Sequence, residues 1–181
     1  MMWLALIKQY WHVSLFKESP ANTPYSLLLL GLVTGVFFIL VVLQWMMADI
    51  ATHFTFSTAL LAGSSLILSY GLFTFGLLSA RHVSNRTVQS LTCLFAGHTL
   101  IHLVASPLLF IAPWLAEAKL APELALLLGV MYLLFTIVLT LWQVMISTHI
   151  YKHALSIAYF PAVLASFGLI ACNILMVSLW Q

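Results

Sequence analysis

The segment Gln89–Trp114, QSLTCLFAGHTLIHLVASPLLFIAPW, decides the predicted fold because it is long, apolar and contains two histidines four residues apart. A helix rises 1.5 Å per residue, so about 20 apolar residues cross the ~30 Å hydrocarbon core of a bilayer, and this segment is longer than that. His98 and His102 then lie near the middle of the membrane, where an ionisable side chain is costly and usually faces other protein. The segment therefore predicts a membrane span with a polar centre.

The composition of the whole chain places it in the same class. Of its 181 residues, 64% are hydrophobic and 6% are charged, which excludes an ordinary soluble domain. A net charge of +2 on scattered basic residues does not suit a nucleic-acid-binding surface. Cys93 and Cys172 lie inside apolar runs, and we interpret them as small buried side chains rather than a disulfide. We expect an all-α fold, a polytopic transmembrane helical bundle surrounded by lipid.

Polar breaks and prolines divide the chain into an N-terminal segment and a transmembrane domain of five spans. Residues 1–24 form the cytoplasmic or interfacial N-terminal segment, and residues 25–181 form the transmembrane domain. The polar stretch THIYKHAL at residues 148–155 either follows the fourth span or extends it as helix. The predicted spans cover residues 25–47, 56–80, 89–114, 124–147 and 157–180.

The first residues predict a short amphipathic helix. If residues 2–16 are helical, Lys8, Gln9 and His12 spread around one side. Two interpretations stay open, a helix that lies in the headgroup region and a stub that leads into the first span. The other side of the helix would carry Trp3, Leu6, Ile7, Tyr10, Trp11 and Ser14.

Small residues and prolines indicate how the spans pack. Gly31 and Gly35 form a small-xxx-small pair, which predicts that another helix approaches the first span closely. The second span is rich in Gly and Ser and is predicted to lie inside the bundle, whereas the fourth has few polar residues and is predicted to face lipid. Pro107 removes a backbone hydrogen bond, so we expect the third span to bend near Ser106.

The distribution of basic residues predicts the orientation, because cytoplasmic loops carry an excess of Lys and Arg. With the N-terminus in the cytoplasm, only Lys119 falls outside, and five spans then place the C-terminus outside. We expect a multi-pass protein of an inner membrane. The basic residues that fall inside are Lys8, Lys17, Arg81, Arg86 and Lys152.

Polar residues at similar depths in the second, third and fifth spans predict a polar cluster at the membrane centre. One interpretation is that these groups hold the helices together by interhelical hydrogen bonds worth about 0.6 kcal/mol each. The alternative is the polar pathway of a small transporter or channel subunit centred on His98 and His102. The candidate residues are Ser69, His98, His102, Cys172 and Asn173.

The spacing of four histidines raises the question of a haem or metal site. His98 with His102, and His149 with His153, have the i, i+4 spacing of paired ligands on one helix face. The two pairs differ in depth by about 15 Å, which argues against a haem held between them. No carboxylate lies at the depth of His98, so we predict no metal and no cofactor, and a membrane redox or metal-binding protein is the second alternative.

A second candidate site is a basic patch at the inner membrane surface. We expect its cations to contact anionic lipid headgroups, at about 1 kcal/mol for each Lys or Arg. The alternative is a pH-dependent or metal-binding cytoplasmic patch. Its residues are Arg81, Arg86, His149, Lys152 and His153.

The plan of the chain resembles the Yip1-domain family. A short cytoplasmic segment ends in prolines, at Ser19-Pro20 and Pro24, and five closely spaced spans follow within 181 residues. The resemblance implies a non-catalytic protein of membrane organisation or trafficking and implies no site residues. The chain contains none of the common hydrolase, metalloprotease or P-loop motifs. We therefore expect a non-enzymatic interaction or accessory protein that binds other membrane subunits or itself.

Overall fold

A computed structural model describes residues 2–47, 55–117 and 121–180, and every long element in these ranges is a helix. Five of the helices are long and apolar enough to cross a membrane, and the sixth is the short N-terminal helix. This confirms the all-helical class and the five helices of spanning length. The elements are α1 (Met2–Ser14), η1 (Pro20–Asn22), α2 (Leu27–Met47), α3 (Phe56–Ala80), η3 (Ser84–Arg86), α4 (Thr87–Glu117), α5 (Pro122–Leu155) and α6 (Tyr159–Ser178).

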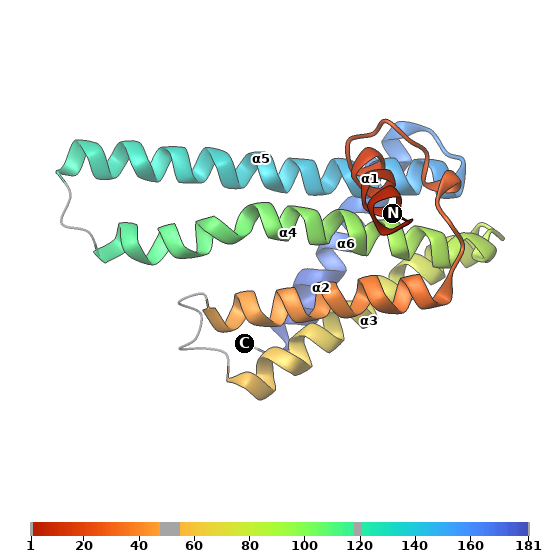
Figure 1. Cartoon of the computed structure of the whole chain (residues 1–181), viewed down its shortest axis with the longest axis horizontal. Coiled ribbons are helices and arrows are strands. Elements are labelled where there is room, and N and C mark those ends of the chain that lie inside the picture. The colour runs from red at the N-terminus through yellow and green to blue at the C-terminus, as the bar shows by residue number, and fades with distance from the viewer. Residues whose placement is uncertain (1, 48–54, 118–120, 181) are drawn as a thin grey trace.

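The five long helices run alternately up and down the bundle (Figure 1). The connections that contain η1 and η3 and the turn between α5 and α6 lie at one end, which we call the predicted cytoplasmic end. Helix α4 is the most enclosed of the five, because 44% of the residues in its most apolar stretch of 18 are buried. Helix α3, expected in the interior, follows with 33%, and α5, expected to face lipid, has 6%.

The polar stretch at residues 148–155 extends α5 rather than ending it. The helix continues to Leu155 because Ile150 and Tyr151 in this stretch are completely buried, as is Ile146 just before it. It stops at Ser156, whose φ of 53° lies in the left-handed region that ends many helices. The 34 residues of α5 correspond to about 51 Å of helix, more than a bilayer core requires.

Close helix packing occurs at glycines other than the predicted pair. A Cβ atom at Gly31 or Gly35 would have no described atom within 4 Å, so the predicted contact is wrong for packing within this chain. A Cβ at Gly63 would lie 2.9 Å from Phe38, and one at Gly168 would lie 2.9 Å from Phe73. In the helix pairs α2–α3 and α3–α6, the absent side chain therefore leaves room for a phenylalanine ring of the neighbouring helix.

Helix α1 is docked on the bundle at the predicted cytoplasmic end (Figure 1). Tyr10, Val13 and Ser14 are buried, whereas Trp3 and Ile7 from the predicted apolar side are exposed. A glycine on α4 permits this docking, because a Cβ at Gly97 would lie 3.3 Å from Ser14 Oγ and 2.8 Å from Ile146 Cγ2. Burial raises the pKa of the Tyr10 hydroxyl above its ordinary value.

Two hydrogen bonds from α5 hold the end of α1 and the segment after it. Trp142 Nε1 donates to the carbonyl oxygen of Ser14 at 3.0 Å, and the His149 Nε2 atom lies 2.8 Å from the carbonyl oxygen of Glu18. The Phe16 ring contacts the His149 ring edge-on, with 5.6 Å between ring centroids. The N-terminal segment therefore belongs to the packed structure, which neither of the two sequence interpretations anticipated.

Candidate functional site

His98 occupies the centre of the bundle, completely buried on α4 between α3 and α5. Its Nδ1 atom is hydrogen-bonded to the Tyr70 hydroxyl, and its Nε2 atom lies 3.0 Å from Ser147 Oγ. Ser147 Oγ donates its proton to the carbonyl oxygen of Gln143, at 3.1 Å, so Ser147 accepts from His98 Nε2–H. Nδ1 is then the acceptor for Tyr70. A neutral His98 with its proton on Nε2 satisfies all of these groups and links three helices.

His102 lies one turn further along α4 and interacts with α2 instead. Its Nδ1 atom lies 2.7 Å from Gln44 Oε1. Gln44 Nε2 donates to the carbonyl oxygen of His102 at 2.8 Å and to Ser106 Oγ at 2.9 Å. Ser106 Oγ also donates to the His102 carbonyl, at 2.9 Å. Gln44 thus supports α4 in the turn that precedes Pro107.

The axis of α4 bends between the bundle and the α4–α5 connection (Figure 1). This agrees with the predicted bend near Ser106, since Pro107 has no N–H to donate to the preceding turn. The helix nevertheless continues to Glu117. The carbonyl that Pro107 leaves without its helical donor is that of Leu103, one residue after the His102 carbonyl that Gln44 contacts, so Gln44 holds the adjacent part of the turn but does not replace the missing bond.

Further polar contacts join α3, α5 and α6 within the bundle. Two hydroxyl pairs join α3 to α5 and α5 to α6, and the indole N–H of Trp180, which follows α6, donates to a hydroxyl on α3. The contacts are Thr74 Oγ1 with the Tyr151 hydroxyl at 2.9 Å, Thr148 Oγ1 with Ser166 Oγ at 3.0 Å, and Trp180 Nε1 with Ser65 Oγ at 3.0 Å.

The five residues of the predicted central cluster do not form one hydrogen-bonded group. His98 and His102 have separate partners, as described above. Ser69 on α3 and Asn173 on α6 are buried, but Ser69 Oγ and Asn173 Oδ1 have no hydrogen-bond partner among the described residues. Cys172 is a half-buried free thiol.

The partners of both histidines, Tyr70, Ser147 and Gln44, were not among the predicted site residues. A signal for Gln44 was present, because it is the only amide side chain in the first predicted span. Tyr70 and Ser147 were harder to single out, since each is close in the sequence to other Ser, Thr or Gly residues. A search for hydroxyl groups at the depth of His98 would have considered them.

The predicted basic patch is partly used for packing within the chain. Arg86 Nη1 donates to the carbonyl oxygens of His153 at 3.1 Å and Ala154 at 2.8 Å, and to Ser156 Oγ at 3.2 Å. Arg86 therefore caps the C-terminal end of α5, where a cation is also favoured by the helix dipole. Arg81 and Lys152 are exposed at the same end of the bundle.

The donor set for a metal is sparse in the part of the chain that the structure describes. No three His, Cys, Asp or Glu side chains converge there in a way that could hold a metal ion. His149 and His153, the pair with ligand spacing on α5, have ring centroids 4.5 Å apart, and His149 also contacts the Glu18 carbonyl. The central polar residues link the helices to one another. In addition, the His98 imidazole connects the hydroxyl groups of Tyr70 and Ser147.

Comparison with known proteins gave no match, either to a family model, to a curated protein sequence or to a solved structure.

Proposed function

We propose that the chain is a non-enzymatic integral membrane protein that acts as an interaction or accessory subunit. The observation that carries this proposal is the hairpin formed by α4 and α5, which extends past the end of α2 (Figure 1). Helix α2 has 21 residues, or about 32 Å, which is enough to cross the hydrocarbon core. The 34 residues of α5 continue well beyond that length.

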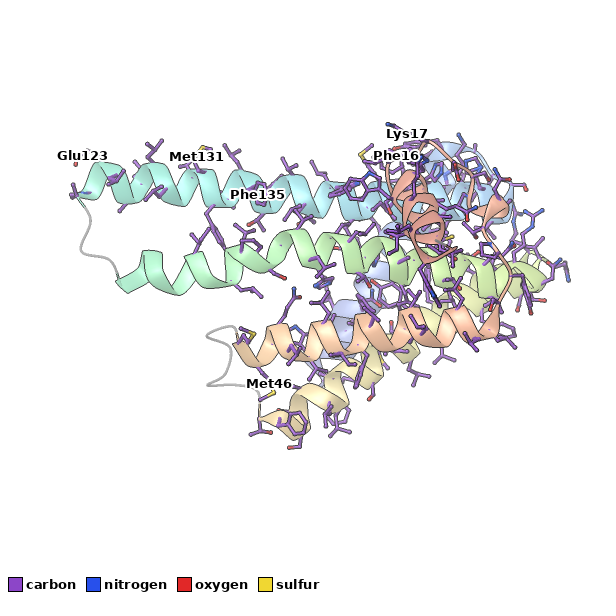
Figure 2. The ribbon with its side chains drawn as sticks, in the orientation of Figure 1. Phe16, Lys17, Met46, Glu123, Met131 and Phe135 are labelled. Carbon is purple, nitrogen blue, oxygen red and sulfur yellow. The ribbon has the colours of Figure 1, made fainter. Side chains whose placement is uncertain are left out.

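The protruding part of α5 is apolar and uncovered. Figure 2 places Met131 beyond Met46 at the end of α2, and Glu123 at the tip of the hairpin. Exposed apolar surface costs about 25 cal/mol per Å² in water, so these side chains need lipid or another protein around them. Within the protruding part, the exposed residues include Leu124, Leu126, Leu127, Val130 and Met131, with 45–71% of their surface accessible.

A helix longer than the bilayer core can tilt, but tilting this bundle also tilts α2, whose length already matches the core. Contact with another membrane helix covers the same surface without that change. Helix α5 has two parts. Ile146, Ile150 and Tyr151 are buried and hold its C-terminal part in the bundle, whereas its N-terminal part protrudes. The outer part is then available for association with a second copy or another subunit.

Disulfide cross-linking in native membranes tests this role. Cys93 and Cys172 are first replaced by alanine, and a single cysteine is introduced at Leu127 on the hairpin or, as the control, at Met47 on α2. The two positions have matched exposure, 58% and 57%. We expect Leu127→Cys alone to give a discrete product, either a dimer of the chain or a cross-link to one partner identified by mass. No product, or the same products from both positions, would refute the proposal.

The membrane and the orientation form part of the same proposal. The positive-inside distribution of Lys and Arg supports an inner membrane with the N-terminus in the cytoplasm. The five-span plan also supports a role in membrane organisation like that of the Yip1-domain proteins it resembles. A reporter enzyme that is active only outside the cytoplasm should be active when fused after Trp180 and inactive when inserted between Val83 and Ser84. The reverse pattern of reporter activity would mean that the N-terminus lies outside the cytoplasm.

A second candidate function is that of a small transporter or channel subunit, which the Tyr70–His98–Ser147 chain favours. These three groups connect hydroxyls through an imidazole across three helices, as a proton relay requires. In this case proton flux into vesicles that contain the purified protein should be lost in His98→Leu and strongly reduced in His102→Leu. Flux that is absent from the unaltered protein, or unchanged in both variants, excludes this function.

A further inference from the structure

An open cavity of about 290 Å³ lies between α2, α3 and α6, away from the α4–α5 hairpin. Asn173 is the polar residue that lines its inner part, and Val177 and Ser178 place its other part near the C-terminal end of α6. The complete lining is Trp45, Leu66, Asn173, Ile174, Val177 and Ser178.

Two buried side chains, Asn173 in the cavity lining and Ser69 on α3, each have an oxygen without a hydrogen-bond partner among the described residues. Asn173 is 9% exposed and its Oδ1 atom makes no hydrogen bond, and the same is true of the Oγ atom of Ser69, a residue that is 4% exposed. Each such group, if left unpaired, costs about 1–3 kcal/mol. Buried polar groups in proteins are therefore nearly always paired, with protein or with water.

The register of α3 against α6 brings these two groups to the same level. The helices are antiparallel, with Phe73 opposite Gly168 and Ser65 Oγ 3.4 Å from the carbonyl oxygen of Met176. Halfway between these contacts, Ser69 lies opposite residues 172 and 173. An acceptor on α6 and a hydroxyl on α3 thus occupy the same layer of the helix interface, and the acceptor belongs to the cavity lining.

We propose that this cavity is a hydrated site that binds water, entering from the C-terminal end of α6, with Asn173 and Ser69 as its polar partners. A buried water typically makes two to four hydrogen bonds and needs about 10–15 Å³ of accessible volume, so 290 Å³ is ample. Water next to Asn173 provides hydrogen bonds for both unpaired oxygen atoms, Asn173 Oδ1 and Ser69 Oγ. A lipid acyl chain, the competing occupant, fills the space but leaves both groups unpaired.

The reactivity of an introduced thiol distinguishes water from lipid, because a charged methanethiosulfonate reaches and modifies only thiols in contact with water. Cys93 and Cys172 are replaced by alanine, and a cysteine replaces Val177, which lines the cavity, or Leu175, which is 66% exposed on the same helix and does not line it. We expect Val177→Cys to react at least tenfold faster than Leu175→Cys in the membrane-embedded full chain. An uncharged maleimide that enters lipid serves as the control that both thiols are present.

The polar partners are tested in the same assay. Asn173→Leu removes the amide and should lower the reaction rate at Val177→Cys to that of Leu175→Cys. Asn173→Ser retains a hydrogen-bonding group and should keep most of the reaction rate at Val177→Cys. Equal rates at Val177→Cys and Leu175→Cys with the charged reagent would mean that lipid fills the cavity and would overturn the proposal. A fast reaction that Asn173→Leu leaves unchanged would overturn the assignment of Asn173 as a partner.

Both outcomes are independent of the proposed interaction role. The cavity uses α2, α3 and α6, whereas the cross-linking test uses the tip of α5. A lipid-filled cavity therefore leaves the cross-linking result unaffected, and the failure of cross-linking leaves the hydration of the cavity unaffected.

Discussion

Replacing Gly97 by alanine adds one methyl group at the point where α1, α4 and α5 meet. The new Cβ would lie 2.8 Å from Ile146 Cγ2 and 3.3 Å from Ser14 Oγ. Carbon atoms in normal contact are about 3.5–4.0 Å apart, so Ile146 has to retreat by roughly 0.7–1.2 Å. Ile146 is completely buried and is stiff because it is branched at Cβ, which leaves it little freedom to move.

The expected loss of stability is the difference between two effects. Overpacking of a well-packed interior costs about 1–3 kcal/mol. Replacing glycine by alanine inside a helix returns about 0.5–1 kcal/mol, because alanine loses less backbone entropy. We therefore expect Gly97→Ala to lower the free energy of unfolding by about 1 kcal/mol, and by about 2.5 kcal/mol at most. Gly35→Ala is the matched control, since nothing lies within 4 Å of its added Cβ, and it should be neutral or slightly stabilising.

Equilibrium unfolding by SDS in mixed micelles, followed by tryptophan fluorescence, measures the two variants side by side. A second test removes the clashing atom: in an Ile146→Ala background, Gly97→Ala should carry no penalty, so the double-mutant cycle should show coupling of about 1 kcal/mol or more. The reasoning is refuted if Gly97→Ala and Gly35→Ala have the same stability, or if the cycle shows no coupling.

Three further predictions concern single side-chain contacts. Tyr70→Phe removes the hydroxyl bonded to His98 and should lower the free energy of unfolding by about 0.6–1.7 kcal/mol, whereas the exposed Tyr25→Phe should not change it. Arg86→Gln removes the cap of α5 and should speed amide exchange at residues 153–158, measured by mass spectrometry, while the exposed Arg81→Gln leaves it unchanged. Burial raises the pKa of Tyr10, so docking of α1 should be retained below about pH 10 and lost progressively above it, and Tyr10→Phe should abolish this alkaline transition in tryptophan fluorescence.

The spans were predictable because length and apolar composition are local properties of a sequence. The helices α2 and α3 end where the predicted spans end, at Met47 and Ala80. The continuation of α5 to Leu155 was left open, since THIYKHAL is polar enough to be a loop. What makes it helix is the burial of residues such as Tyr151 against other helices, together with the cap from Arg86, and neither is a local property.

The contacts of the candidate site were less predictable for the same reason. The pattern of Gly31 and Gly35 is a common packing motif, yet neighbouring side chains pack closely at Gly63, Gly97 and Gly168 instead. Whether a glycine is used depends on which large side chain faces it from another helix. Likewise, the depth of His98 could be counted along the chain, but its partners depend on the rotation of α3 and α5 about their axes.

The docking of α1 has a consequence for how the chain assembles. Trp142 and His149 bind carbonyl groups that lie 128 and 131 residues earlier in the sequence. Helix α1 is synthesised before α5, yet its binding site does not exist until α5 has been synthesised and inserted. Because closing so long a loop is slow compared with local helix formation, α1 is fixed in place only after α5, although it is made before it. A bulky domain fused directly to the N-terminus should therefore leave membrane insertion intact and delay the docking of α1.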